Sequence, residues 1–132
     1  MTIKIAVTGG AGYIGAHVVR DLLDHEYQVT VVDDMSSGNE ANIFTGEARY
    51  DFRRGDVNTQ TGLEMLLADR PDVVFHFAAL KAAGESMTIP ERYSRHNIRG
   101  TLRLLEEMVQ AGVGQMVFSS SAAVYGEPRY VP

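Results

Sequence analysis

Residues 8–15 read Thr8-Gly9-Gly10-Ala11-Gly12-Tyr13-Ile14-Gly15, so half of this eight-residue segment is glycine. Gly10, Gly12 and Gly15 satisfy the pattern G-x-G-x-x-G. The pattern G-x-x-G-x-x-G is satisfied as well, through Gly9, Gly12 and Gly15. Glycines at this spacing let the chain turn tightly out of a strand, bring backbone N–H groups close to a pyrophosphate and pack the next helix on the sheet. The alternative is a flexible turn, and the flanking segments distinguish the two.

Short apolar runs alternate with amphipathic segments along the chain. The apolar runs, typical of buried parallel strands, cover residues 3–7, 29–32, 72–77 and 115–118, with a weaker and more polar run at 49–53. Helical spacing of apolar residues is present in residues 13–25, 63–67 and 90–111. This alternation predicts β-α-β units with right-handed crossovers. We therefore expect an α/β fold of Rossmann type, a doubly wound parallel sheet of five strands in the order 3-2-1-4-5, ending before a sixth strand.

The predicted helix over residues 90–111 carries two lines of apolar residues. One line contains Ile98, Leu102, Leu105 and Val109, and the other contains Thr101, Leu104 and Met108. An apolar face of this width predicts packing against more than one neighbour, including a neighbour in another subunit. The fifth strand would also expose an unpaired edge, which favours association. We expect the chain to self-associate through one of these two surfaces.

Composition and charge restrict the class of protein. With 132 residues, 45% of them hydrophobic and 22% charged, the chain suits one globular domain. A net charge of −5 offers no basic surface for nucleic acid or an anionic membrane. No apolar run approaches the roughly 18 residues that span a bilayer, and the N-terminus lacks a signal-peptide pattern. The absence of cysteine and the scattered histidines predict no disulfide and no metal site. The cytoplasm is the default location.

An acidic pair follows the second predicted strand. Asp33 lies eighteen residues beyond Gly15, and Asp34 comes next. A carboxylate at this point accepts hydrogen bonds from the ribose of a dinucleotide and repels a 2′-phosphate. No basic residue occurs between Asp33 and Arg49, so we expect NAD rather than NADP. The alternative role for Asp33 is to cap a turn or helix. Asp56, after the third strand, is equally suited to contact adenine or to form an Asx turn or N-cap.

The polar residues of the fourth and fifth predicted strands carry less information. His76 stands inside an apolar run and is interpreted as a core histidine rather than a catalytic one. Ser119, Ser120 and Ser121 follow the fifth strand, at the sheet edge where ligands of open α/β sheets collect. That position favours a substrate-facing role over ordinary loop hydroxyls. Tyr125 has no lysine one helical turn onward to lower its phenol pKa from about 10, so we assign it a structural role.

Several longer motifs resemble the extended short-chain dehydrogenase/reductase family, and within it the nucleotide-sugar 4-epimerases. The resemblance covers essentially the whole chain and is most specific in residues 8–15, 76–86, 97–102 and 119–126. It implies NAD as cofactor and a UDP-sugar as substrate. The cofactor-binding residues that it implies are Gly9, Gly12, Tyr13, Ile14 and Gly15, then Asp33, Asp34, Ser36, Ser37 and Gly38, then Asp56 and Val57, then Phe77, Ala78, Ala79 and Lys81, and finally Asn97 and Ser119.

The resemblance also implies a distribution of roles along the cofactor. The glycine turn would line the pyrophosphate, Asp33 the adenosine ribose, and residues 34–38 the adenosine end. Asp56 and Val57 would line the adenine, and residues 77–81 the nicotinamide. Ser121 matches the catalytic serine of the family, which hydrogen-bonds the sugar 4-oxygen while UDP-glucose and UDP-galactose are interconverted through a 4-keto sugar.

The catalytic tyrosine of that family belongs to a Tyr-x-x-x-Lys motif, and these 132 residues contain no such motif. We therefore expect an incomplete NAD-binding domain over residues 1–132, without the sugar-binding region and inactive alone. One alternative is a free-standing NAD-binding module. Another is a relative of the nucleotide-sugar 4,6-dehydratases, which carry Asp-Glu where this chain has Ala122 and Ala123. Two alanines cannot supply the acid and base that dehydration needs, so the epimerase is the better match.

Overall fold

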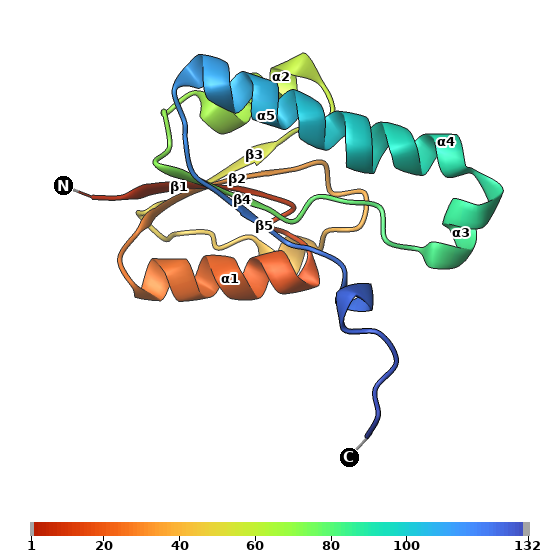
Figure 1. Cartoon of the computed structure of the whole chain (residues 1–132). Coiled ribbons are helices and arrows are strands. Elements are labelled where there is room, and N and C mark those ends of the chain that lie inside the picture. The colour runs from red at the N-terminus through yellow and green to blue at the C-terminus, as the bar shows by residue number, and fades with distance from the viewer. Residues whose placement is uncertain (1, 131–132) are drawn as a thin grey trace.

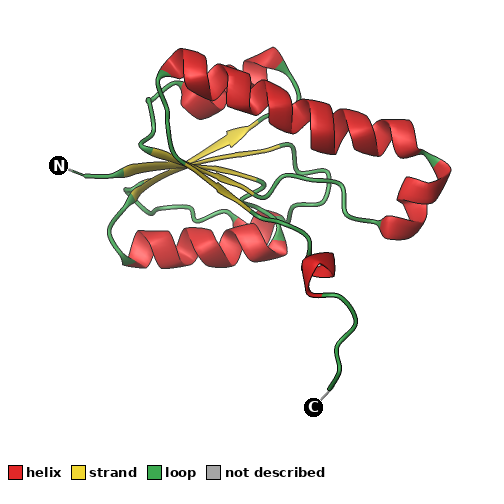
Figure 2. Cartoon of the chain, in the orientation of Figure 1, coloured by secondary structure: helices red, strands yellow, loops and turns green. Residues whose placement is uncertain are grey.

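The computed structural model describes residues 2–130 and has three layers (Figure 1). A parallel sheet forms the middle layer. Helix α1 (Tyr13–Asp24) covers one face, and helices α2 (Gln60–Leu67) and α5 (Gly100–Ala111) cover the other. Figure 2 shows loops, in green, joining the ends of the strands to the helices that cover the sheet. Positions 1, 131 and 132 of the predicted domain lie outside the described residues.

The five strands all pair in parallel. They are β1 (Lys4–Thr8), β2 (Gln28–Asp33), β3 (Tyr50–Arg54), β4 (Val73–His76) and β5 (Met116–Phe118). Their order across the sheet, β3-β2-β1-β4-β5, confirms the predicted 3-2-1-4-5 arrangement, with the polar strand at an edge. Strand β1 starts one residue later than expected and includes Thr8, whose register partners are Val32 and His76. The carboxyl ends of β1, β2 and β4 therefore meet at one edge.

Apolar residues fill both faces of the sheet because the central strands are covered on both sides. Along β1, Ile5 and Val7 pack toward α1, whereas Ala6 packs toward α2 and α5. The cluster on the α1 side also contains Val19, Leu22, Leu23, Val29 and Val31. The cluster on the opposite side also contains Val32, Val57, Leu63, Leu66, Leu67, Val74, Leu104, Met108 and Val113. The strand edge that carries the polar residues is thus held by two packed layers.

The predicted helix over residues 90–111 is not a uniform α-helix. It consists of α4 (Pro90–Tyr93), a π-helical turn η2 (Ser94–Arg99) and α5, and a short helix α3 (Ala83–Thr88) precedes it. The apolar lines lie almost wholly within α5, so their spacing could not reveal the wider turn before it. Such π turns are rare and frequently stand at functional sites. This one carries Asn97.

The two apolar lines of α5 differ in burial. Leu104 and Met108 are 1% and 3% exposed and pack on the sheet. The other line remains open, because Leu102 and Val109 are 55% and 79% exposed. The expected second neighbour is therefore not found among residues 2–130. In this described part, no helix is both long and apolar enough to cross a membrane.

Candidate functional site

A cleft of about 790 Å³ opens at the carboxyl ends of the strands. It brings together segments that are far apart in sequence: the glycine turn, the ends of β2, β3 and β4, the π turn and the serine segment. The predicted residues that line it are Gly9, Gly12, Tyr13, Ile14, Gly15, Asp33, Asp34, Ser36, Ser37, Asp56, Val57, Phe77, Ala78, Ala79, Lys81, Asn97, Ser119 and Ser121. Gly38 is not among the lining residues, and a β-carbon there would lie 3.0 Å from the Ala11 and Met35 side chains and 3.2 Å from Asp33 Oδ1.

Steric contacts explain the glycines of the turn. Gly9 has a φ of +70°, and its N–H donates to Val32 O over 3.1 Å. A β-carbon on Gly15 would lie 2.2 Å from Gly9 O, because the first turn of α1 crosses directly over the strand exit. A β-carbon on Gly10 would lie 2.7 Å from a methyl group of Val31. Only glycine satisfies these contacts without moving the turn.

The first turn of α1 presents free donors to the cleft. The first α-helical bond, from Ala16 N to Gly12 O, is 2.9 Å long, and the N–H groups of Tyr13, Ile14 and Gly15 precede it. Gly12 provides no side-chain cap, and no acidic residue stands in the first turn. The positive end of the helix dipole is therefore not neutralised locally, as anion binding requires.

Asp33 ends β2 beside this turn and is 8% exposed. Its Oδ2 accepts from Ala11 N at 3.0 Å, and its Oδ1 accepts from Met35 N at 2.8 Å. The turn-capping role is thus real. Each carboxylate oxygen has a second lone pair, so the same side chain retains acceptor capacity toward the cleft. The capping and ribose-binding roles are compatible.

Asp56 follows β3 and forms the Asx turn that its sequence position allowed. Its Oδ1 accepts from Asn58 N at 2.8 Å and from Asn58 Nδ2 at 2.9 Å. The N-cap of α2 is Thr59, three residues after Asp56, and Thr59 Oγ1 accepts from Gly62 N. Asn58 Nδ2 also lies 3.0 Å from His96 Nδ1 in the π turn. Asn58 and His96 both line the cleft, and the sequence patterns indicated neither of them.

His76 is buried in the floor of the cleft, as expected for a core histidine. Its Nδ1 lies 2.7 Å from Thr8 Oγ1, and its Nε2 lies 3.2 Å from Thr101 Oγ1. Burial lowers the pKa of His76 to about 4, so the ring is neutral near pH 7. Because the ring is neutral and both of its nitrogens are hydrogen-bonded to protein groups, His76 is poorly suited to act as a general acid or base.

The loop after β4 is fixed from the π turn. Asn97 Oδ1 accepts from Leu80 N at 2.9 Å, and Asn97 Nδ2 donates to Leu80 O at 2.8 Å. This pair of bonds ties residues 77–81 to the long helix. The cleft is lined here by the flat ring of Phe77 and the small side chains of Ala78 and Ala79. The Lys81 side chain is exposed at the rim of the cleft.

The serine segment lies beyond β5 at the same edge. Ser121 caps the 3-10 helix η3 (Ala122–Tyr125), because its Oγ accepts from Ala123 N at 3.1 Å. Its hydroxyl hydrogen remains available for another acceptor. Tyr125 is 87% exposed, which corrects the structural role assigned to it, since a residue so exposed packs little.

A cluster at the outer wall was not indicated by sequence. Glu85 of α3 accepts from Tyr93 Oη at 2.5 Å and from Arg92 Nη1 at 3.2 Å. The hydrogen bond to Glu85 raises the pKa of Tyr93 above its ordinary value of 10. Arg92 and Tyr93 line the cleft.

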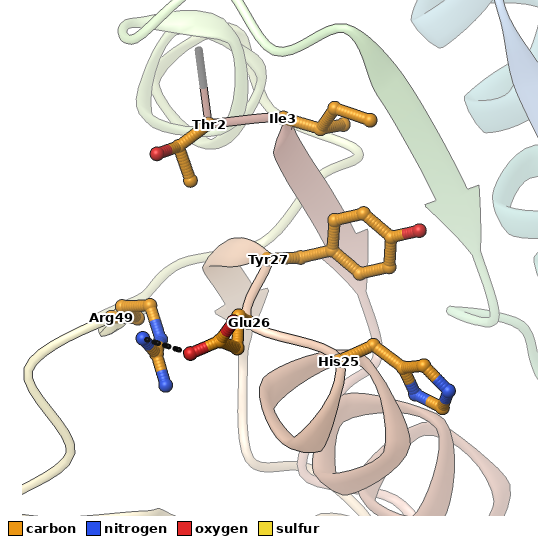
Figure 3. A pocket seen from close by; sticks show the side chains of 6 residues that line it. All are labelled: Thr2, Ile3, His25, Glu26, Tyr27 and Arg49. Carbon is orange, nitrogen blue, oxygen red and sulfur yellow. Dashed lines mark ion pairs between the residues drawn. The ribbon is translucent and has the colours of Figure 1, made fainter.

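A second hollow, of about 360 Å³, lies at the opposite, amino-terminal edge of the sheet (Figure 3). Its lining is Thr2, Ile3, His25, Glu26, Tyr27 and Arg49, with Arg49 Nη1 paired to Glu26 Oε1 at 3.6 Å. None of the predicted site residues lies there. Within residues 2–130, no group of three His, Cys, Asp or Glu side chains is placed to hold a metal ion.

Comparison with known proteins agrees with this geometry. Residues 5–132 match the NAD dependent epimerase/dehydratase family. UDP-glucose 4-epimerase 3 of Oryza sativa subsp. japonica is 42% identical over 98% of this chain and 37% of its own length. UDP-glucose 4-epimerase of Neisseria meningitidis serogroup C is 44% identical over 98% of this chain and 40% of its own length.

A solved structure extends the comparison to three dimensions. UDP-glucose-4-epimerase from Stenotrophomonas maltophila, with bound NAD and formylated UDP-arabinopyranose, has a TM-score of 0.84 and 38% identity over 100% of this chain and 40% of that one. The chain therefore spans about two fifths of the length of the relatives that it matches. Both the sequence match and the shared fold lead to one conclusion: this chain belongs to the NAD-dependent epimerase/dehydratase family.

Proposed function

We propose that the chain is the NAD-binding portion of a UDP-glucose 4-epimerase. The observation that carries the proposal is that the free N–H groups at the start of α1 and the carboxylate of Asp33 line one cleft. A dinucleotide needs donors for its pyrophosphate and an acceptor for its ribose at this spacing. The relatives named as UDP-glucose 4-epimerases, one of them solved with NAD, support the same cofactor.

Each part of the cleft has a role in this proposal. The N–H groups of residues 13–15 would hold the pyrophosphate, and Asp33 would accept from the adenosine ribose. Residues 34–38 would border the adenosine end, and Val57 with the backbone of Asp56 would border the adenine. The loop 77–81, tied down by Asn97, would flank the nicotinamide together with Ser119.

The proposed reaction interconverts UDP-glucose and UDP-galactose through a 4-keto sugar. Bound NAD would supply the hydride acceptor for sugar C4. Ser121 would donate its hydroxyl hydrogen toward the sugar 4-oxygen, while its own oxygen is held by Ala123 N. Proton transfer at that oxygen needs the tyrosine of a Tyr-x-x-x-Lys motif, which these 132 residues do not contain. Loss of a general acid–base group typically costs about 10²–10⁴-fold in rate.

The proposal therefore includes an incomplete domain over residues 1–132 and no turnover by this chain alone. It also includes a place in galactose metabolism, a cytoplasmic location and self-association through the open line of α5 or the edge of β5. Exposed apolar side chains at both surfaces support the last point, with Phe118 56% exposed on β5. Turnover of UDP-galactose by the purified chain would contradict the inactivity.

Isothermal titration calorimetry of the purified chain with NAD and with NADP tests the cofactor assignment. We expect saturable binding of NAD with one site per chain and much weaker binding of NADP, because the ribose end of the cleft is acidic. No heat of binding with NAD, from protein shown to be folded by circular dichroism, would refute the proposed function.

A further inference from the structure

Asp33 and Arg54 end neighbouring strands and are register partners across the β2–β3 pair. Paired residues of parallel strands point to the same face of the sheet. Asp33 shares its face with Val31, and Arg54 shares its face with Phe52. Both of those residues belong to the cluster on the α1 side, so the arginine stem rises beside the carboxylate proposed to hold the ribose.

A third residue, Glu40, forms an ion pair with the guanidinium of Arg54. Arg54 Nη2 pairs with Glu40 Oε1 at 2.5 Å. Glu40 begins the 3-10 helix η1 (Glu40–Asn42), which is anchored over the glycine turn. Asn39 N donates to Ala11 O at 3.1 Å, and Asn42 Nδ2 donates to the same oxygen at 2.8 Å. The backbone of Glu40 is thus held between two residues that are bonded to the glycine turn.

The Glu40–Arg54 pair has its main consequence in charge rather than in stability. The two side chains are 71% and 59% exposed, and ion pairs this exposed contribute little to folding. However, sheet pairing sets the backbone of Arg54 beside that of Asp33, and the guanidinium lies at the end of a flexible side chain that starts there. With its charge matched by Glu40, the ribose end keeps the excess negative charge of Asp33 and Asp34.

We propose that Glu40 is a cofactor-discrimination residue, which holds Arg54 so that its guanidinium is not available to a 2′-phosphate. The inference rests on the proposed function, NAD binding, and deepens it. An arginine near the ribose is how a dinucleotide site accommodates the 2′-phosphate of NADP, because the guanidinium binds phosphate with paired hydrogen bonds. In this chain that arginine is present, and a carboxylate on the adjoining loop occupies it.

A double-mutant cycle tests the inference with four versions of this 132-residue chain: wild type, Glu40→Gln, Arg54→Gln and the double variant. NAD and NADP are titrated calorimetrically into each at low salt. We expect Glu40→Gln to raise the affinity for NADP relative to NAD by about three- to tenfold, the effect of one additional charged hydrogen bond near the surface. This increase should vanish in the double variant. It should also vanish in 1 M NaCl, where the Debye length falls to about 3 Å.

The four proteins separate the outcomes. If Glu40→Gln leaves the NADP to NAD ratio unchanged, the inference is wrong while NAD binding stands. An increase that persists in the double variant would be a general charge effect and would also overturn it. Failure of the wild type to bind NAD overturns the proposed function, and the inference falls with it. Circular dichroism should show all four folded, because both side chains are exposed.

Discussion

Thr8 Oγ1 lies 2.7 Å from His76 Nδ1, at the end of two paired strands. The same oxygen accepts from Phe77 N at 3.2 Å and from Ala78 N at 3.1 Å, so its one hydrogen is directed to the imidazole. His76 Nδ1 must then accept, and Nε2 carries the hydrogen that faces Thr101 Oγ1. A single hydroxyl therefore joins the strand before the glycine turn to the loop at the other end of the cleft.

The burial of His76 makes stability depend on pH. Its pKa is lowered from 6.5 to about 4 in the folded protein, so between these values the unfolded chain binds a proton that the folded one refuses. The part of the free energy of unfolding that depends on a neutral His76 is fully present above pH 6.5 and is lost as the pH falls toward 4. We expect a loss of about 2 kcal/mol in the free energy of unfolding between pH 7 and pH 5, measured with urea. In His76→Asn, which can both accept and donate, this loss should be much smaller, and an equal loss in both proteins would contradict the assignment.

Replacing Thr8 by valine keeps the shape of the side chain and removes its hydroxyl. The N–H group of Ala78 and the acceptor nitrogen of His76 would then lack a partner at a largely buried position, whereas Phe77 N keeps its bond to the backbone oxygen of Thr8. We expect Thr8→Val to lower the free energy of unfolding by about 1–3 kcal/mol. Thr8→Ser retains the hydroxyl and should cost less. Urea denaturation of the two variants checks the order, which would be reversed if the methyl group mattered more than the hydrogen bonds.

Local pattern was sufficient to predict the sheet and the glycine turn. Apolar runs separated by helical spacing indicate parallel β-α-β units, and the glycine turn after the first strand favours the doubly wound fold, whose strand order is 3-2-1-4-5. Gly15 and Asp33 were identified because the turn and the strand end that follow from this order require those residue types. The steric contact at Gly15 explains why glycine is needed there, and the backbone bonds of Asp33 show its capping role, whereas its ribose role stays a prediction.

Contacts between distant segments could not be predicted in the same way. Arg54 is twenty-one residues from Asp33, and only the register of β2 and β3 sets them side by side. The contact between Asn58 and His96 joins a loop to a π turn that has no sequence signature of its own.

Asp33→Asn should weaken NAD binding. The substitution removes the charge from the ribose acceptor and turns an amide nitrogen toward one of the two N–H donors that now face a carboxylate. Loss of one charge-assisted hydrogen bond of about 1.5–3 kcal/mol corresponds to roughly ten- to hundredfold in dissociation constant. Asp24→Asn, at an exposed position outside the cleft, is the matched control and should change the affinity far less. Calorimetric titration with NAD decides, and equal effects of the two variants would count against the role of Asp33.

Gly15→Ala should disrupt the turn rather than merely lower its flexibility. The added methyl group would stand 2.2 Å from Gly9 O and 2.9 Å from Gly10 Cα, so α1 must move off the sheet. Overpacking of this kind costs about 1–3 kcal/mol, and we expect NAD binding to be lost with it. Gly84→Ala serves as the control, because nothing lies within 4 Å of its β-carbon in α3. That variant should keep or slightly raise stability in thermal unfolding; comparable losses in both variants would rule out the steric explanation.

The open apolar line of α5 should drive self-association of the chain. Leu102 and Val109 are 55% and 79% exposed and are separated by two helical turns on one face. Leu102→Glu together with Val109→Glu would place two charges in any interface formed there, and burial of unpaired charges is unfavourable. Sedimentation velocity at increasing protein concentration should show association of the wild type and a monomer for the double variant. Glu106→Gln, which changes an exposed polar residue of the same helix, should associate like the wild type. If the double variant associates as strongly as the wild type, the edge of β5 becomes the interface to test, because Val117 and Phe118 are 45% and 56% exposed there.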